Sequence, residues 1–418
     1  MTAAPPDAAW LNALIALLQS AQLAVLRALH AVGLADTVHG QPAWPWTRRF
    51  SGEYLLIDIG QARHLAITLV LLAGVVSLVL IAVFWRRRRW WVLAVVPLVL
   101  VLAPWPDARV VLVPAHPTSF HAPPAPLSVA GVERGRAVYA QQCVACHGDN
   151  GRGQGPLAAD QPVWPPNLAG PLLWRRADGD LLWAVMHGTR DRTGRTTMRG
   201  HADRLTDADA WAALDFLRAQ AAGEMLRASG SWMLPVALPD VAVRCGAAAP
   251  RALSSWRGQR VRVVAAASDN APEPARAAVQ AVREDPRLVT VWLRGPNAAD
   301  AGPALPAGSA PPTAPAFPTA DDCVADDARA WRTFALVAGT QALEGAQFLA
   351  DRDGWLRARS QPGQAGWSED DLVCRTDAPP RAASPGATPG KPLADGLGAL
   401  ITLMDTEPVR FVKGGFVH

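Results

Sequence analysis

The sequence predicts a multidomain protein, with an α-helical transmembrane hairpin followed by an all-α domain and then an α/β domain. Its 418 residues exceed the length of one ordinary domain. Long apolar runs stand near the beginning of the chain, and strand patterns alternate with a helix pattern toward its end. We expect a membrane region at residues 1–113, a proline-rich connector at 114–127, the all-α domain at 128–223 and the α/β domain at 234–418.

Two apolar runs predict the transmembrane hairpin. Residues 65–85 carry no charged side chain and are long enough to cross the hydrocarbon core of a bilayer. Residues 90–113 contain Asp107 and Arg109 as their only charged residues. Residues 9–34 form a third apolar stretch that polar side chains interrupt. This stretch predicts either a further span or an amphipathic helix on a membrane or on neighbouring helices.

The arginines between the two runs predict the orientation. Arg86 to Arg89 form a short basic turn, and such turns remain in the cytoplasm. The chain after residue 113 is therefore expected on the other side. The abundance of arginine, alanine and proline is typical of a GC-rich bacterial genome, so we predict the bacterial inner membrane, with the later domains in the periplasm. Arg48 and Arg49 count against this orientation, because they would then lie outside.

The clearest chemical motif is the pentapeptide from Cys143 to His147. Two cysteines separated by two residues, with a histidine directly after the second, are the attachment sequence of a c-type haem. One helical turn presents the thiols of Cys143 and Cys146 to the two vinyl groups of the porphyrin, while His147 is left to bind the iron. The motif therefore predicts one covalent haem c.

Helix patterns flank this motif. Residues 131–140 place Gly135 on a helix face, and residues 205–218 carry an apolar stripe after an N-cap at Thr206 or Asp207. The arrangement resembles the class I cytochrome c fold, an all-α domain in which the first and last helices cross closely. The resemblance implies that Gly135 permits this approach.

Met198 is the candidate for the sixth iron ligand. It lies about 13 residues before Trp211, where the distal methionine of class I cytochromes stands relative to the last helix. Met186, His187 and His201 are the competing residues. Two axial ligands leave no open coordination position for oxygen chemistry. We therefore expect an electron carrier rather than an enzyme, with its role as a subunit of a larger oxidoreductase left open.

The segment Pro165-Pro166-Asn167-Leu168 carries a further resemblance to the cytochromes. It is similar to the segment whose proline carbonyl accepts a hydrogen bond from the proximal imidazole. The resemblance implies that this segment orients His147. The same residues are equally typical of a loop before a helix.

A second resemblance covers about residues 50–221. The second apolar run, the histidines His116 and His121, the proline-rich connector and the haem motif together resemble the carboxyl-terminal part of bacterial copper resistance protein D relatives fused to a cytochrome c. Residues 178–188 also resemble their cytochrome portion. The resemblance implies copper handling as the alternative function and further membrane subunits as partners. His116 and His121 would then bind copper, which imidazoles suit, although a polar linker explains the pair as well.

The carboxyl-terminal region has strand patterns at residues 260–267 and 288–293, on either side of a helix at 273–283. A hairpin follows at residues 347–359, turned at Asp353-Gly354. This order resembles the thioredoxin-like fold. Where that family carries its redox pair of cysteines, this chain has Ser268-Asp269-Asn270-Ala271-Pro272. The resemblance therefore implies a degenerate domain used for binding or docking, without dithiol exchange.

Three cysteines remain outside the haem motif. In an oxidising compartment two of them are expected to pair. We expect Cys323 to pair with Cys374, because each lies in an acidic segment, and Cys245 to be free or buried.

These observations predict a membrane-anchored periplasmic monohaem cytochrome c that carries out single-electron transfer. Its expected partners are the inner membrane and redox partner proteins. The nearly balanced charge, with 40 basic and 36 acidic side chains, gives no indication of a nucleic-acid partner. Copper handling with an accessory haem domain remains the alternative.

Overall fold

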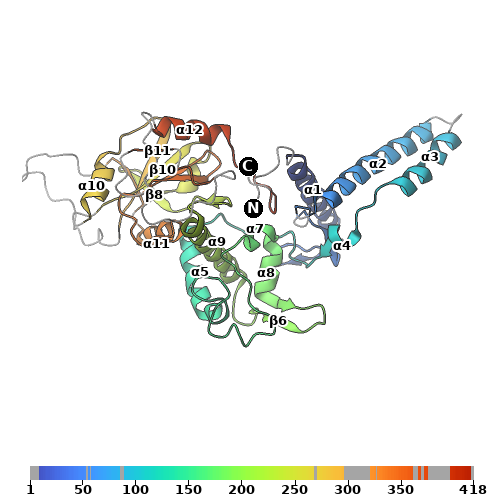
Figure 1. The fold of residues 1–418 in the computed structure, drawn as a ribbon, viewed down its shortest axis with the longest axis horizontal. Coiled ribbons are helices and arrows are strands. Elements are labelled where there is room, and N and C mark those ends of the chain that lie inside the picture. Colours follow the sequence, from blue (N-terminus) through green and yellow to red (C-terminus); the bar gives the residue numbers. More distant parts are fainter. Residues whose placement is uncertain are drawn as a thin grey trace, which may run out of the picture. The chain divides into compact units, whose positions relative to one another are not determined.

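A computed structural model describes residues 9–52, 55–56, 58–84, 89–267, 271–295, 321–325, 327–360, 366–368, 371–374 and 396–415 (Figure 1). The chain forms two compact units. The first unit comprises Met1–Ala122, Arg175–Trp183 and Val412–Phe416, and the second comprises Pro123–Trp174, Ala184–Phe411 and Val417–His418. Residues 175–183, which we expected within the all-α domain, thus cluster with the first unit.

The first unit contains four helices and four short strands within the residues described: α1 (Ala9–Ala31), β1 (Thr37–Val38), β2 (Gln41–Pro42), β3 (Arg48–Phe50), α2 (Ile59–Phe84), α3 (Arg89–Leu102), α4 (Ala108–Val111) and β4 (Leu112–Pro114). β1 pairs with β2, and β3 pairs with β4, both antiparallel. An ion pair closes this unit, because the guanidinium of Arg49 donates to Asp180 at 2.7 Å. Ser119 also bonds Asp180, so this aspartate holds its helix turn in the first unit.

α1 buries one face and exposes the other. Leu11, Leu14, Ile15 and Leu18 follow the spacing of a helix face and pack in one core with Leu65 of α2. Leu17 and Val25 lie on the exposed side. This burial agrees with the amphipathic alternative. Among the described residues, α1 and α2 are the two helices that are long and apolar enough to cross a membrane, so length and composition keep the other alternative open for α1.

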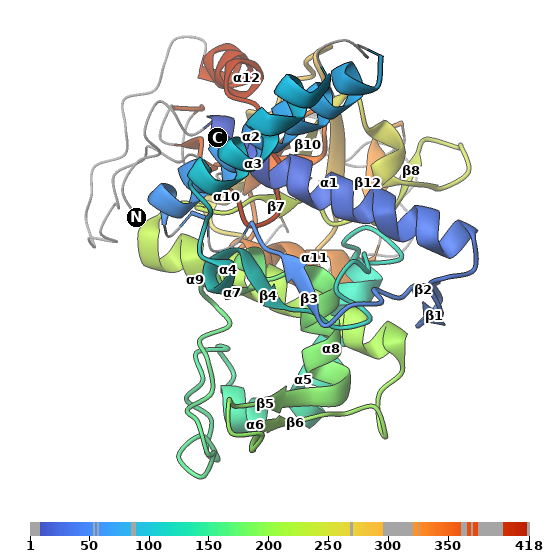
Figure 2. The same ribbon diagram turned by 90° about the vertical axis from the view of Figure 1, so that its right-hand side faces the viewer.

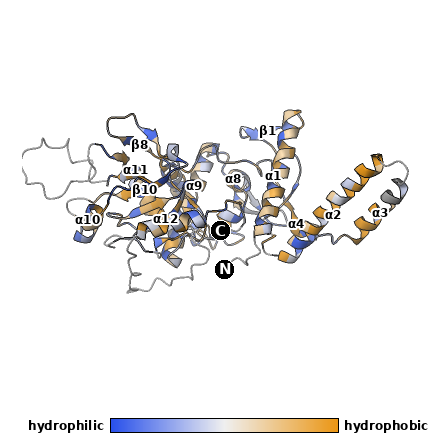
Figure 3. Cartoon of the chain, turned by 90° about the horizontal axis from the view of Figure 1, so that it is seen from above, coloured by the Kyte–Doolittle hydropathy of each residue, from blue (hydrophilic) through white to orange (hydrophobic). Residues whose placement is uncertain are grey.

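α2 and α3 lie side by side (Figure 1 and Figure 2). α2 has 26 residues and is therefore about 39 Å long. Most of its apolar side chains are exposed, and hydrophobic residues make up most of its length (Figure 3). An exposed apolar helix of this length is typical of a segment that faces lipid.

The second predicted span, residues 90–113, is wrong in its extent. α3 ends at Leu102, and its 14 residues reach only about 21 Å. α3 continues through Pro97, but Pro104 and Pro106 follow its end two residues apart, and two prolines without N–H groups so close together favour a helix end. The rest of the run forms α4 and β4, where Val113 pairs with Arg49 of β3. Arg86 to Arg88 of the predicted basic turn lie outside the described residues, and Arg89 begins α3.

The haem-motif region of the second unit is mainly helical. It contains α5 (Val129–Gln142), α6 (Val144–His147), α7 (Leu172–Arg175), the strands β5 (Gly188–Arg190) and β6 (Thr196–Arg199), and α9 (Asp207–Ser229). α8 (Asp178–His187) begins in the first unit and contributes residues 184–187 to this one. α9 begins with a capping box, in which Thr206 and Asp209 satisfy each other's backbone N–H groups. It continues well past the expected end at residue 218 and stops at Gly230, which adopts a left-handed conformation.

The remainder of the second unit is a curled mixed sheet with helices on it. Its elements are β7 (Val236–Ala237), β8 (Ala242–Cys245), β9 (Arg251–Ala252), η1 (Leu253–Trp256), β10 (Arg260–Ala265), α10 (Glu273–Gln280), β11 (Leu288–Leu293), β12 (Cys323–Ala325), α11 (Ala328–Val337), β13 (Gln347–Ala350), β14 (Trp355–Arg359) and α12 (Gly396–Thr406). The strand order is β7-β14-β13-β10-β11-β12-β8-β9. The expected β-α-β unit is confirmed by the parallel pairing of β10 and β11, and the expected hairpin by the antiparallel pairing of β13 and β14. Ser268–Asn270, at the place of the absent redox motif, lie outside the described residues.

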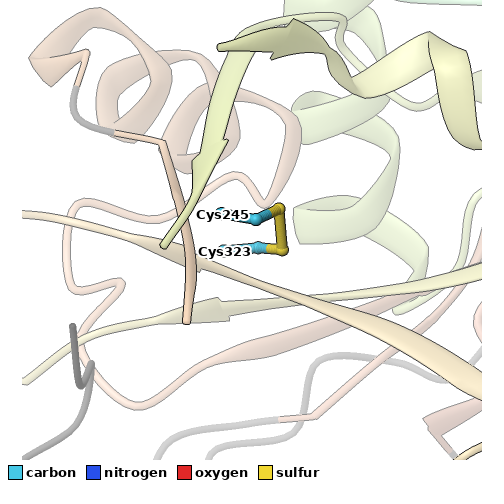
Figure 4. Close-up of a disulfide and its surroundings, with 2 residues drawn as sticks. All are labelled: Cys245 and Cys323. Atoms are coloured by element: carbon cyan, nitrogen blue, oxygen red, sulfur yellow. A yellow bond between two sulfur atoms is a disulfide. The ribbon is translucent and has the colours of Figure 1, made fainter. Parts of the chain in front are cut away.

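The disulfide differs from our expectation. Cys245 of β8 stands directly opposite Cys323 of β12, and these two residues form the bond (Figure 4). Cys374 is instead buried beside Trp174 and Val409, and burial raises the pKa of its thiol to about 12. The predicted Cys323–Cys374 pair is therefore wrong, because strand register and not the acidity of the flanking segments decides which thiols meet.

Candidate haem site

The haem motif occupies one helical turn. Cys143 ends α5 and begins α6, and its carbonyl accepts the N–H of His147 at 3.0 Å. The thiols of Cys143 and Cys146 are both free and half-buried. Burial, with a smaller contribution from Cys146, raises the pKa of Cys143 to about 11. Two reduced thiols one turn apart are what thioether formation with two vinyl groups requires, so these residues fit a covalent haem.

A glycine-rich loop returns against this turn. The N–H groups of Gly153 and Gly155 donate to the carbonyls of His147 and Cys146, at 2.9 and 3.1 Å. Gly153 has a φ of +77°, and a Cβ atom there would overlap the carbonyl oxygen of Pro165. The backbone therefore approaches the motif closely only because side chains are absent at these positions.

His147 is buried, which lowers the pKa of its imidazole, and the backbone of Pro166 partly offsets this effect. The ring is therefore neutral at pH 7, the form that binds iron. Pro166 lies close enough to influence the ring, as the sequence resemblance implied. The Nδ1 atom nevertheless lacks a hydrogen bond of standard geometry.

The crossing of α5 and α9 holds the residues on both sides of the haem motif. A Cβ atom on Gly135 would overlap the carbonyl oxygen of Ala212 in α9, so the expected close approach at Gly135 is confirmed. One turn later, Tyr139 packs on Phe216 of α9, with 5.2 Å between the ring centroids. Its hydroxyl donates to the carbonyl of Gly148 at 2.6 Å, and burial raises the pKa of this phenol. The helix pair thereby fixes the start of the loop that follows His147.

Met198 and the three competing residues have different surroundings. Met198 is half-buried on β6, where it pairs with Thr189 of β5. Met186 is buried in α8, and His187 is exposed. The N–H of His201 bonds the carbonyl of Met186 at 3.0 Å, and burial, with a smaller contribution from Arg204, lowers the pKa of its imidazole. Met198 thus lies on a short hairpin at the carboxyl end of α8.

The two histidines suggested for copper have different surroundings. His116 stacks on Trp183, with 5.0 Å between the centroids. His121 is buried, and its ring centroid lies 6.5 Å from that of His39. In the described parts of the chain, no group of three or more histidine, cysteine or acidic side chains is arranged to hold a metal ion.

Sequence reasoning missed a set of polar residues around the loop. Arg152 donates to Glu224 of α9 at 2.9 Å, and the side-chain amide of Gln220 donates to the carbonyl of Asp149. Glu224 lies beyond the predicted end of its helix. No local pattern in the sequence connects these residues, which are separated by 71 and 72 positions.

Comparison with known proteins adds one family assignment. A model of the cytochrome c family matches residues 132–221. No curated protein matches the chain. Among solved structures, a chain of the Kuenenia stuttgartiensis reducing HAO-like protein complex Kustc0457/Kustc0458 is 22% identical, with a TM-score of 0.21; the match covers 31% of this chain and 59% of that one. A likeness this low carries no argument about fold or function. Residues 132–221 form a cytochrome c domain, and its cofactor is a covalently bound haem c.

Proposed function

We propose that this protein is a membrane-anchored monohaem cytochrome c that transfers single electrons on the periplasmic side of the bacterial inner membrane. The observation that carries the proposal is the haem motif within the matched family domain: two free thiols and a neutral, buried His147 on one helical turn. A bound haem c supplies one reversible electron.

The side chains take distinct roles in this proposal. Cys143 and Cys146 hold the porphyrin through thioethers, and His147 is the proximal iron ligand. Met198 would hold the iron as a second protein ligand, and an iron held by two side chains favours electron transfer over oxygen chemistry. Tyr139 and Pro166 keep the proximal loop and the imidazole in place.

The membrane placement rests on α2. Its exposed apolar side chains need a nonpolar surrounding, and its 26 residues suffice to cross a bilayer. The arginine turn after α2 supports a cytoplasmic hairpin and periplasmic domains. Arg49 counted against periplasmic placement in the sequence. It is paired with Asp180 and is therefore not a free positive charge.

The hairpin that carries Met198 supports docking of redox partners with acidic surfaces. Arg190, Arg192 and Arg199 are all exposed there. Asp191 is neutralised by Arg195 at 3.2 Å, so the hairpin keeps an excess of positive charge. For the sheet that follows, we propose a thioredoxin-like fold used in partner binding, which the β10-α10-β11 unit and the β13–β14 hairpin support. Copper handling is the second candidate, supported by the nearness of His39 and His121.

The proposal is tested on the full chain in detergent. We expect haem that stays attached under denaturing electrophoresis and a redox titration that follows a one-electron curve. In Met198→Ala, the near-infrared band of methionine-ligated iron disappears, the midpoint potential falls, and the reduced protein binds carbon monoxide. The control Met186→Ala keeps the band, because Met186 serves the core. A Met198→Ala protein with an unchanged band and potential would remove Met198 as a ligand, and a chain without covalent haem would overturn the function.

A further inference from the structure

The loop after the haem motif is held from its outer side by one carboxylate. Glu224 has 8% of its side chain exposed and lies on α9. One of its oxygens accepts from Arg152 of the loop at 2.9 Å, and the other accepts from Arg227, one turn further along α9. A buried carboxylate is stabilised in its charged form by charge-assisted hydrogen bonds of this kind. Glu224 thereby ties the loop to the helix.

The tether acts directly beside the proximal histidine. Arg152 precedes Gly153, whose N–H donates to the carbonyl of His147 at 2.9 Å. One turn earlier on α9, Gln220 holds the carbonyl of Asp149. α9 thus bonds the loop at two residues, Asp149 and Arg152.

The sheet domain packs on the same turn of α9. A Cβ atom on Gly223 would overlap the carbonyl oxygen of Leu336 in α11. Gly339, just after α11, has a φ of +62°, and a Cβ atom there would overlap the carbonyl of Gly223 and lie 2.8 Å from Arg227. Gly223 and Arg227, which flank Glu224 on α9, are therefore packed against the sheet domain.

This turn lies outside the segment that the cytochrome c family accounts for, which ends at residue 221. Gly223, Glu224 and Arg227 all follow that point. Arg152 lies inside the matched segment, so only the carboxylate end of the tether belongs to the extension of α9 on which the sheet domain packs.

We propose that Glu224 is a positioning residue for His147, that it acts through Arg152 and the proximal loop, and that the sheet domain holds it in place. The domain then has a role beyond partner binding: it stabilises the proximal side of the haem. The inference rests on the proposed function only in taking His147 as the iron ligand.

Amide hydrogen exchange on the full chain with its haem attached tests the tether. In Glu224→Gln, which keeps the shape and removes the charge, we expect the amides of residues 151–157 to exchange at least tenfold faster. Arg152→Gln cuts the tether at its exposed end, so it should give the same result even if the first variant folds poorly.

Glu133→Gln is the matched control. Glu133 is also mostly buried, with 13% exposed, and also accepts from two arginines, Arg136 at 3.2 Å and Arg332 of α11 at 2.9 Å. It contacts the same sheet domain but not the loop, so exchange at 151–157 should remain as in the wild type. Unchanged exchange in Glu224→Gln and Arg152→Gln, or an equal rise in Glu133→Gln, would overturn the proposal.

Two further readouts separate positioning from general stability. At the wild-type midpoint potential, Glu224→Gln should change the ratio of reduced to oxidised haem at least threefold, while Glu133→Gln should not. Gly339→Ala should loosen residues 151–157. Gly354→Ala, which is also strained at a φ of +84° but whose Cβ atom would meet only the Arg257 side chain at an ordinary 3.7 Å, should not. Equal effects of both glycine variants would refute the role of the sheet domain. Haem attachment is verified on a denaturing gel beforehand, so failure of the proposed function is recognised separately.

Discussion

The helix pair α2–α3 and the helix pair α5–α9 place their apolar side chains in opposite surroundings. In α9 the apolar residues face protein, and even the polar Asp215, Gln220 and Glu224 are buried, each with a bonded partner. In α2 most of the apolar residues face outward, and Phe84 is 85% exposed. The comparison teaches that helix length does not reveal a membrane span. The surroundings that the side chains need reveal it.

The largest difference in stability should come from a glycine-to-alanine substitution in each of the two helix pairs. Gly135→Ala forces a Cβ atom into the carbonyl of Ala212, while Gly74→Ala in α2 meets nothing within 4 Å. We expect Gly135→Ala to lower the free energy of unfolding of the cytochrome domain by about 3 kcal/mol or more. Gly74→Ala should leave it unchanged. Thermal unfolding followed by haem absorbance measures both, and equal effects would mean that the close crossing is not needed.

A charge in α2 gives the next largest effect. Leu80 is 56% exposed, so Leu80→Asp costs little in water but about 2.5–3.5 kcal/mol at the centre of a membrane. We expect the variant to be lost from membranes under alkaline carbonate extraction. Val163→Asp places the same charge at a similarly exposed residue of the cytochrome region and should stay membrane-bound. Full retention of the Leu80 variant would contradict the anchor.

The smallest effect concerns how α9 begins. Hydrogen bonds from Thr206, with a further contribution from Arg134, lower the pKa of Asp209 to about 2. An unfolded aspartate has a pKa near 3.9, so the folded state binds fewer protons between about pH 4 and pH 2. The stabilisation is present above this range and is lost as the pH falls through it.

Asp209→Asn should therefore flatten the acid side of the stability curve, by no more than about 1 kcal/mol, the usual contribution of a helix cap. Chemical denaturation at pH 5 and pH 3 measures this. An unchanged slope in Asp209→Asn would show that the capping box does not contribute.

The cytochrome region could be predicted well because its signals are local. The spacing of Cys143, Cys146 and His147 spans one helical turn, and the cap at Thr206 reaches three residues. The hairpin turned at Asp353-Gly354 joins neighbouring strands. These interactions join residues that are close together in the sequence, so a local sequence pattern predicts them directly.

Other features could not be predicted because they join distant positions. Cys245 and Cys323 are 78 residues apart and meet because β8 and β12 align in register. The end of the second apolar run forms β4 because it pairs with β3, and hydropathy alone does not contain that pairing. In both cases a contact made by the folded chain outweighed the local pattern.

The sequence by itself determined the haem attachment turn, the apolar character of α2 and the close crossing at Gly135. Each depends on side chains within a few residues or on the absence of one. Only the tertiary structure decided which thiols pair and which carboxylate ties the proximal loop. Glu224 reaches Arg152 because α9 continues past the crossing and the sheet domain packs on its last turns. Packing between distant parts of the chain brings the paired thiols together, and it also brings Glu224 to Arg152. The spacing of these residues in the sequence does not predict either contact.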